Sequence, residues 1–227
     1  MIIDGFNKLT LLDYPGHIAS IIFTRGCNFA CSYCQNSSLI KCDKSKGLIS
    51  EEEILRYLES RKNVLEGLVV SGGEPTIQKG LKEFIKKVKN IGLKVKLDTN
   101  GSNPKVLKEL IEENLIDYVA MDIKNDLDSY EDVTKCKVNI KLIKESIEIL
   151  KKSNIDYEFR TTTMKEYHSL DKIKNIVSII DDEKYYIQNF KLSDDVIDKS
   201  LHGFSIEELN ALKEKLKNKE NIEIRGL

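Results

Sequence analysis

Three cysteines within one short segment constrain this chain more than any other feature. Cys27, Cys31 and Cys34 are spaced C-x3-C-x2-C, and the apolar run 19–23 leads directly into them. Such a run is typical of a buried strand, so the cysteines are expected in a loop just after a strand. Three thiolates in one loop favour a soft metal or an iron–sulfur cluster. Because a cubane cluster usually takes four cysteines, three would leave one iron with an open coordination position.

Two other interpretations of the cysteines stay open on the spacing alone. A closed zinc site needs four ligands, and Cys42 is the nearest thiol that would complete one. A redox disulfide between Cys31 and Cys34 also fits their C-x2-C spacing. Cys136, the fifth cysteine, is interpreted as an ordinary thiol.

Composition excludes several classes of protein. The 227 residues carry 37 acidic and 36 basic side chains, for a net charge of −1, so no polyanion-binding surface and no nucleic-acid partner are expected. No segment approaches the ~20 apolar residues that span a membrane. An odd number of cysteines, three of them clustered, argues against a disulfide framework and for a reducing compartment. We therefore expect a cytoplasmic protein, with residues 1–227 forming a single domain.

Strand and helix patterns alternate along most of the chain, which predicts a parallel sheet with helical crossovers. About six such units fall short of the eight in a closed barrel, so we expect an α/β fold of the open, partial β/α barrel type with about six parallel strands. Residues 10–17 are interpreted as a small hairpin and residues 125–138 as a loop over the site. The expected strands are 19–23, 67–70, 93–97, 116–121, 156–162 and 185–190, with a further one at 221–225.

Polar residues recur where these strands end. In parallel α/β proteins the carboxyl ends of the strands share one rim, where active sites are built. Charged groups ending buried strands are costly unless they are paired or used. Simpler explanations remain for each, such as a turn at 72–75 or an ion pair between residues 122 and 124. The residues concerned are Gly72, Gly73, Glu74, Asp98, Thr99, Asp122, Lys124, Arg160 and Gln188.

The cysteine spacing, with the aromatic Tyr33 before the third cysteine, resembles the signature of radical S-adenosylmethionine (SAM) enzymes. The resemblance implies a 4Fe–4S cluster held by Cys27, Cys31 and Cys34, with SAM on the open iron. One electron from the cluster would then cleave SAM into methionine and a 5′-deoxyadenosyl radical. It also places Tyr33 and Asn36 at SAM.

Further motifs are similar to the activating enzymes of anaerobic ribonucleoside-triphosphate reductase and to other glycyl-radical-enzyme activases. They occupy residues 12–16, 71–76, 97–101, 120–124 and 158–162. The resemblance implies that the radical takes a hydrogen from the Cα of a glycine on a partner protein. A flavodoxin or ferredoxin would supply the electron.

The same resemblance implies a role for each rim residue. Gly72, Gly73 and Glu74 would bind the SAM amino group, and Lys124 and Arg160 would contact SAM. Asp98 and Asp122, with the backbone near Thr99 and Ala120, match a monovalent-cation site beside SAM. Gln35 stands where many activases have His, so its contact is not assigned.

Two alternatives to the activase are carried forward. One is a radical SAM enzyme acting on a small molecule, such as the small synthase of the 7-deazaguanine pathway. The other is a non-catalytic zinc module formed by the three clustered cysteines with Cys42.

Overall fold

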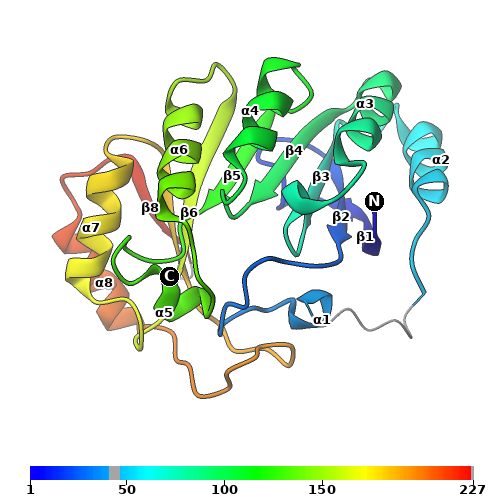
Figure 1. Cartoon of the computed structure of the whole chain (residues 1–227). Coiled ribbons are helices and arrows are strands. Elements are labelled where there is room, and N and C mark those ends of the chain that lie inside the picture. The colour runs from blue at the N-terminus through cyan, green and yellow to red at the C-terminus, as the bar shows by residue number, and fades with distance from the viewer. Residues whose placement is uncertain (41–46, 226–227) are drawn as a thin grey trace.

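The computed structural model describes residues 1–40 and 47–225, which surround one open sheet (Figure 1). In this part of the chain the sheet has eight strands, arranged in sequence order. The first strand runs antiparallel to the second, and every later strand is parallel to its predecessor. The strands are β1 (Ile3–Thr10), β2 (Ala19–Thr24), β3 (Gly67–Gly72), β4 (Lys94–Thr99), β5 (Tyr118–Asp122), β6 (Asp156–Thr163), β7 (Tyr185–Asn189) and β8 (Ile222–Arg225).

The predicted open, partial β/α barrel is confirmed, with β1 and β8 at its two edges. Seven parallel strands are present where about six were expected, because residues 222–225 pair with β7. The N-terminal hairpin is also longer than predicted. Its turn lies near Gly16, as expected, but the whole of β1 pairs with β2.

Helices connect the parallel strands, and capping residues fix several of their ends. The side chains of Ser50 and Ser205 each accept a hydrogen bond from the third residue of their helix, and Gly92 ends another at φ 94°. The helices are α1 (Ser37–Ile40), α2 (Glu51–Arg61), the 3₁₀ turn η1 (Pro75–Ile77), α3 (Leu81–Ile91), α4 (Pro104–Glu112), α5 (Tyr130–Thr134), α6 (Ile140–Lys151), α7 (Leu170–Ile180) and α8 (Ile206–Lys215).

The two faces of the sheet differ because side chains alternate along each strand. The outer face packs against the helices through fully buried apolar side chains such as Leu68, Val95 and Phe159. The inner face carries a small apolar cluster around Tyr14 and Val69, and polar residues follow toward the carboxyl ends of the strands. The main core therefore lies between sheet and helices, and the concave side is left for the site.

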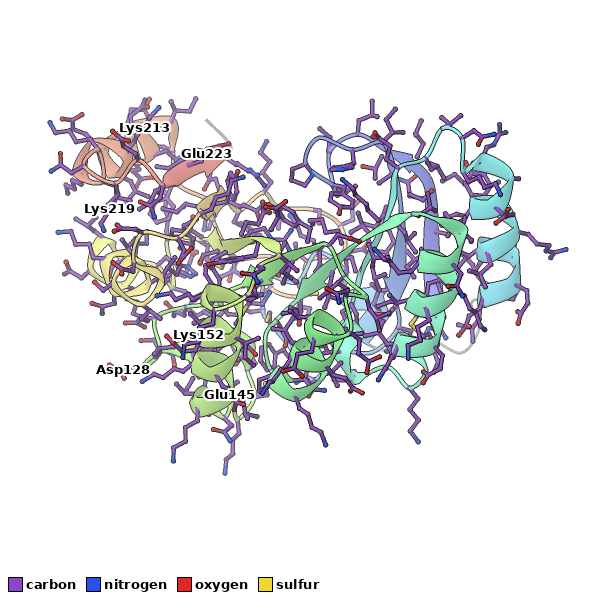
Figure 2. The ribbon with its side chains drawn as sticks, turned by 90° about the horizontal axis from the view of Figure 1, so that it is seen from above. Asp128, Glu145, Lys152, Lys213, Lys219 and Glu223 are labelled. Carbon is purple, nitrogen blue, oxygen red and sulfur yellow. The ribbon has the colours of Figure 1, made fainter. Side chains whose placement is uncertain are left out.

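Charged side chains cover the outside of the helical layer. In Figure 2, Glu145 and Lys152 of the α6 region project away from the sheet, as do Lys213 and Lys219 near the end of the chain. Lys152 is 77% exposed, which agrees with solvated helix faces. None of the helices in the described part of the chain combines the length and apolar character that crossing a bilayer requires.

Candidate active site at the carboxyl ends of the strands

A cavity of about 340 Å³ opens at the carboxyl ends of the strands, on the concave side of the sheet. This volume is typical of small-molecule sites. Thr99, Gln35 and Gln188 also line it, whereas Ala120 does not. All twelve residues predicted to bind the cluster or SAM line this one cavity: Cys27, Cys31, Cys34, Tyr33, Asn36, Gly72, Gly73, Glu74, Asp98, Asp122, Lys124 and Arg160.

The cysteine loop follows β2 and holds its three thiols around one side of the cavity. Cys31 is buried, Cys27 and Cys34 are half-buried, and all three are free thiols. A turn closes between Cys31 and Cys34, whose backbone N–H donates to the Cys31 carbonyl at 3.0 Å. Burial raises the pKa of the Cys27 thiol to about 11 and that of Cys31 to about 12. The thiolates therefore need iron or another cation to persist near neutral pH.

Two segments from far along the chain hold the backbone of this loop, and both lie beside it in Figure 1. The first is residues 125–138, which contains the short helix α5. Its Thr134 and Val133 carbonyls accept hydrogen bonds from Ala30 N–H at 3.0 Å and Ser32 N–H at 3.2 Å. Cys136, in the same segment, has its Sγ 3.6 Å from the Asn28 carbonyl.

The second segment follows β7. The Asp198 N–H donates to the Ser32 carbonyl at 2.9 Å, and the Gln35 side chain donates to the Lys191 carbonyl at 2.8 Å. Gln35 therefore anchors the loop, a contact that the sequence left unassigned. The shape of the cysteine loop is fixed by residues more than 90 positions away.

Two glycines at the end of β3 let that strand meet the start of the cysteine loop. Gly72 has φ 122°, and a Cβ there would lie 2.2 Å from the Thr24 nitrogen. A Cβ at Gly73 would lie 1.9 Å from the Gly26 carbonyl oxygen. No side chain fits at either position, so β3 packs directly on the backbone that leads into Cys27.

The Glu74 carboxylate joins the ends of β3 and β4. It is 1% exposed and caps η1 by accepting from the Thr76 N–H at 3.0 Å and hydroxyl at 2.6 Å. It also accepts from the Thr99 hydroxyl at 2.8 Å and the Asn100 N–H at 2.7 Å. The turn interpretation of this segment is thus realised, and the turn also forms part of the cavity wall.

Five charged side chains, on β4, β5 and β6 or just after β5, form a network beside the cysteines. Asp122 accepts from Arg160 Nε at 2.9 Å and Lys124 Nζ at 3.0 Å. Asp98 lies 3.7 Å from Arg160 Nη1 and pairs with Lys96 Nζ at 2.5 Å. The ion pair between residues 122 and 124 is therefore present, as one part of a larger network.

Burial alone would raise the pKa of Asp122, but the charges of Arg160 and Lys124 lower it to about 2. The same attraction outweighs burial at the two cations, so the pKa of Lys124 and that of Arg160 lie above their ordinary values. All three groups are charged across the physiological pH range. Lys124 Nζ also lies 5.7 Å from the centre of the Tyr33 ring, which brings the network next to the cysteine loop.

Sequence reasoning did not identify His168 as part of this site. It is 1% exposed, and its Nε2 lies 3.1 Å from the Lys124 carbonyl oxygen. Its Nδ1 accepts from the Met164 N–H at 3.3 Å, so Nε2 carries the proton and donates to Lys124. His168 thus supports the backbone of a cavity residue, through partners that no local sequence pattern reveals.

Cys42, the fourth ligand of the zinc alternative, lies outside the described residues. Within residues 1–40 and 47–225, no three His, Cys, Asp or Glu side chains are arranged as ligands of a single metal ion. A cubane differs from such a site because each cysteine binds a different iron.

Comparisons with known proteins agree with this geometry. The family profile described as "Radical SAM superfamily" matches residues 21–180. A Methanocaldococcus jannaschii protein, whose name assigns it to the glycyl-radical enzyme activating enzymes, is 36% identical over 85% of this chain and 81% of its own length. The pyruvate formate-lyase-activating enzyme of Clostridium pasteurianum is 31% identical over 58% of this chain and 56% of that enzyme.

Solved structures share the fold. SuiB of Streptococcus suis superposes with a TM-score of 0.68 at 16% identity, over 91% of this chain and 48% of SuiB. QueE of Escherichia coli superposes with a TM-score of 0.58 at 15% identity, over 99% of this chain and 93% of QueE. Three free thiols and a charged network surround one cavity of this chain, and the family profile matches most of the chain's length. The chain therefore belongs to the radical SAM superfamily, whose members use a 4Fe–4S cluster and SAM.

Proposed function

We propose that this protein is a radical SAM activase that forms a glycyl radical on anaerobic ribonucleoside-triphosphate reductase. The observation that carries the proposal is the single cavity in which three free thiols face a paired charge network. The M. jannaschii relative, which this chain covers over most of its length, supports the activase class. The reductase as target rests on the sequence motifs alone.

Cys27, Cys31 and Cys34 are the proposed cluster ligands. The donor set fits, because three buried or half-buried thiols line one cavity, and burial keeps them neutral until iron replaces their protons. When bound, the cluster supplies the electron that cleaves SAM. The chain's own part is to hold the thiols in place, through the hydrogen bonds of Ala30 and Ser32 to residues 133–134.

SAM is proposed to lie between the cysteines and the charge network. Arg160 and Lys124 would bind its carboxylate, because a guanidinium and an ammonium already fixed by Asp122 need little reordering. Gly72 and Gly73 would present backbone to the amino group. Glu74 would act by holding the ends of β3 and β4 together, because its carboxylate already accepts four hydrogen bonds from the protein.

Tyr33 and Asn36 are proposed to contact SAM from the cysteine loop. Tyr33 is buried beneath Lys124, and Asn36 is exposed at the cavity wall. The open edges of the sheet at β1 and β8 leave the concave side unclosed, which suits a glycine-bearing loop of a partner protein. We propose a flavodoxin or ferredoxin as the electron donor.

The test is an anaerobic reaction of the purified protein with SAM, a reductant and the candidate reductase. The expected result is a glycyl-radical doublet in the EPR spectrum of the reductase, which Cys31→Ala abolishes together with the cluster signal. SAM cleavage without a doublet on any glycyl-radical enzyme of the host would reject the activase assignment. A protein that binds neither iron nor SAM would reject the proposed cluster and SAM site.

A second candidate is a radical SAM enzyme that acts on a small molecule. The feature that favours it is length, since QueE and this chain superpose over nearly their whole lengths. A Clostridium acetobutylicum 7-carboxy-7-deazaguanine synthase is also 32% identical over 38% of this chain. Turnover of a small-molecule substrate without any protein partner would support this candidate.

A further inference from the structure

The two carboxylates that the sequence resemblance assigns to a monovalent cation are both paired with cations of the chain itself. Asp122 accepts hydrogen bonds from Arg160 and Lys124. Asp98 pairs with Lys96 Nζ at 2.5 Å and lies 3.7 Å from Arg160. Both oxygens of Asp122 and the Oδ1 of Asp98 therefore already have positively charged partners.

Lys96 holds its position for structural reasons. It lies two residues before Asp98 on β4, so both side chains point to the concave face. It is only 2% exposed, and its ammonium lies 5.9 Å from the centre of the Tyr118 ring. A buried ammonium is costly unless it is paired, so its bond to Asp98 is a fixed part of the fold.

The charge balance of the network opposes a further cation. Lys96, Lys124 and Arg160 bring three positive charges, and Asp98 and Asp122 bring two negative ones. The next charges along the concave face, Glu158 on β6 and Arg225 on β8, cancel each other at 4.0 Å. Two other carboxylates line the cavity: Glu74 accepts four hydrogen bonds from the protein, and Asp13 accepts one from the Thr10 hydroxyl. Among the five charges around Asp98 and Asp122 themselves, the extra positive charge disfavours Na⁺ or K⁺ there and attracts the carboxylate of SAM.

We propose that the ammonium of Lys96 is the built-in counter-ion of Asp98 beside bound SAM, in place of an exchangeable monovalent cation. Lys96 is then a positioning residue, which acts through Asp98 and Arg160 on the group that binds the SAM carboxylate. The inference rests on the proposed placing of SAM and not on the glycyl target, so it stands or falls separately from the activase assignment. Its consequence is that SAM binding does not depend on Na⁺ or K⁺.

The test measures the SAM dissociation constant of the cluster-loaded protein in NaCl, KCl and tetramethylammonium chloride at equal ionic strength. The wild type is expected to show the same constant in all three salts, within about twofold, because ionic strength alone sets the screening. Affinity that falls about tenfold or more in tetramethylammonium, and returns with Na⁺ or K⁺, would overturn the proposal.

Two variants make the test specific. Lys96→Met keeps the long apolar stem and removes the charge, so its SAM affinity in tetramethylammonium is expected to fall about tenfold or more, and small cations should restore most of it. Broadening of the ²³Na NMR line by this variant and not by the wild type would show the acquired site directly. Lys94→Met is the matched control, since Lys94 lies on the same strand but is exposed.

A Lys96→Met protein that binds SAM as the wild type does, in every salt, would also overturn the proposal. Lys96→Arg retains the charge and is expected to keep cation independence. If Lys96→Met fails to fold, the wild-type salt series and Lys96→Arg still decide the question. Iron content and far-UV circular dichroism identify such a failure.

Discussion

Replacing Glu74 by Gln is expected to destabilise the protein by about 2 kcal/mol, because one buried donor loses its acceptor. The carboxylate takes three hydrogen bonds on Oε1, from the Thr76 N–H and hydroxyl and the Thr99 hydroxyl, and one on Oε2, from the Asn100 N–H. A glutamine amide keeps one oxygen, so it will orient that oxygen toward the three donors and turn its NH₂ toward Asn100. A buried N–H left without an acceptor costs about 1–3 kcal/mol.

Loss of the charge also weakens the three remaining bonds, but it removes the cost of burying a carboxylate, and these effects oppose each other. For a chain of this length, about 2 kcal/mol corresponds to a fall in Tm of about 4–8 °C. The assay is thermal unfolding together with hydrogen exchange at the Asn100 amide, which should become faster in Glu74→Gln. The matched control is Glu83→Gln, on the exposed side of α3, with an expected change within about 0.5 kcal/mol. Equal Tm values for the two variants and unchanged exchange at Asn100 would refute this reasoning.

Three further predictions concern the cavity wall and its support. Gly73→Ala should push the Gly26 backbone away and lower the iron content per chain. The control Gly47→Ala, whose Cβ would meet nothing within 4 Å, should retain iron like the wild type. Equal iron content in both variants would contradict the steric argument. Arg160→Lys should weaken SAM binding, because a lysine cannot bridge Asp122 and Asp98, and should leave the cluster spectrum unchanged. Unchanged SAM affinity would show that Arg160 is not part of the SAM site. Burial lowers the pKa of His168 to about 4. As the pH drops from about 6.5 to 4, this histidine therefore becomes protonated in the unfolded chain but not in the folded protein. The free energy of unfolding should fall by about 3 kcal/mol over that range. Urea titrations at several pH values in that range should show that the unfolding free energy of His168→Gln depends less on pH than that of the wild type. Equal pH dependence in the two proteins would exclude His168 as the cause of the fall.

The sequence was sufficient to predict the shared rim of the sheet because strand endings are marked locally. Buried apolar runs stop at Gly72, Asp98 and Asp122, and parallel topology brings such endings together without any knowledge of contacts. The cysteine loop was recognisable from the apolar run before it together with the close spacing of its three thiols. Helix ends such as Gly92 carried their own signals.

What the sequence did not reveal depends on contacts between distant segments. Alternation along β4 would place Lys94 and Lys96 on one solvated face, but only Lys94 is exposed, because that face of the sheet lines the inside of a partial barrel. His168 bonds to a backbone carbonyl 44 positions away, a partner that has no sequence signature. The length of β1 was missed because much of this edge strand is exposed and so lacks a strong apolar pattern.

The hydrogen bonds that hold the cysteine loop have a consequence for how the protein matures. Carbonyls of Val133, Thr134 and Lys191 accept from the loop, and the N–H of Asp198 donates to it. A nascent chain that has emerged only as far as its three thiols therefore lacks the partners that shape them. We expect iron to be captured late, after residues 133–198 have left the ribosome.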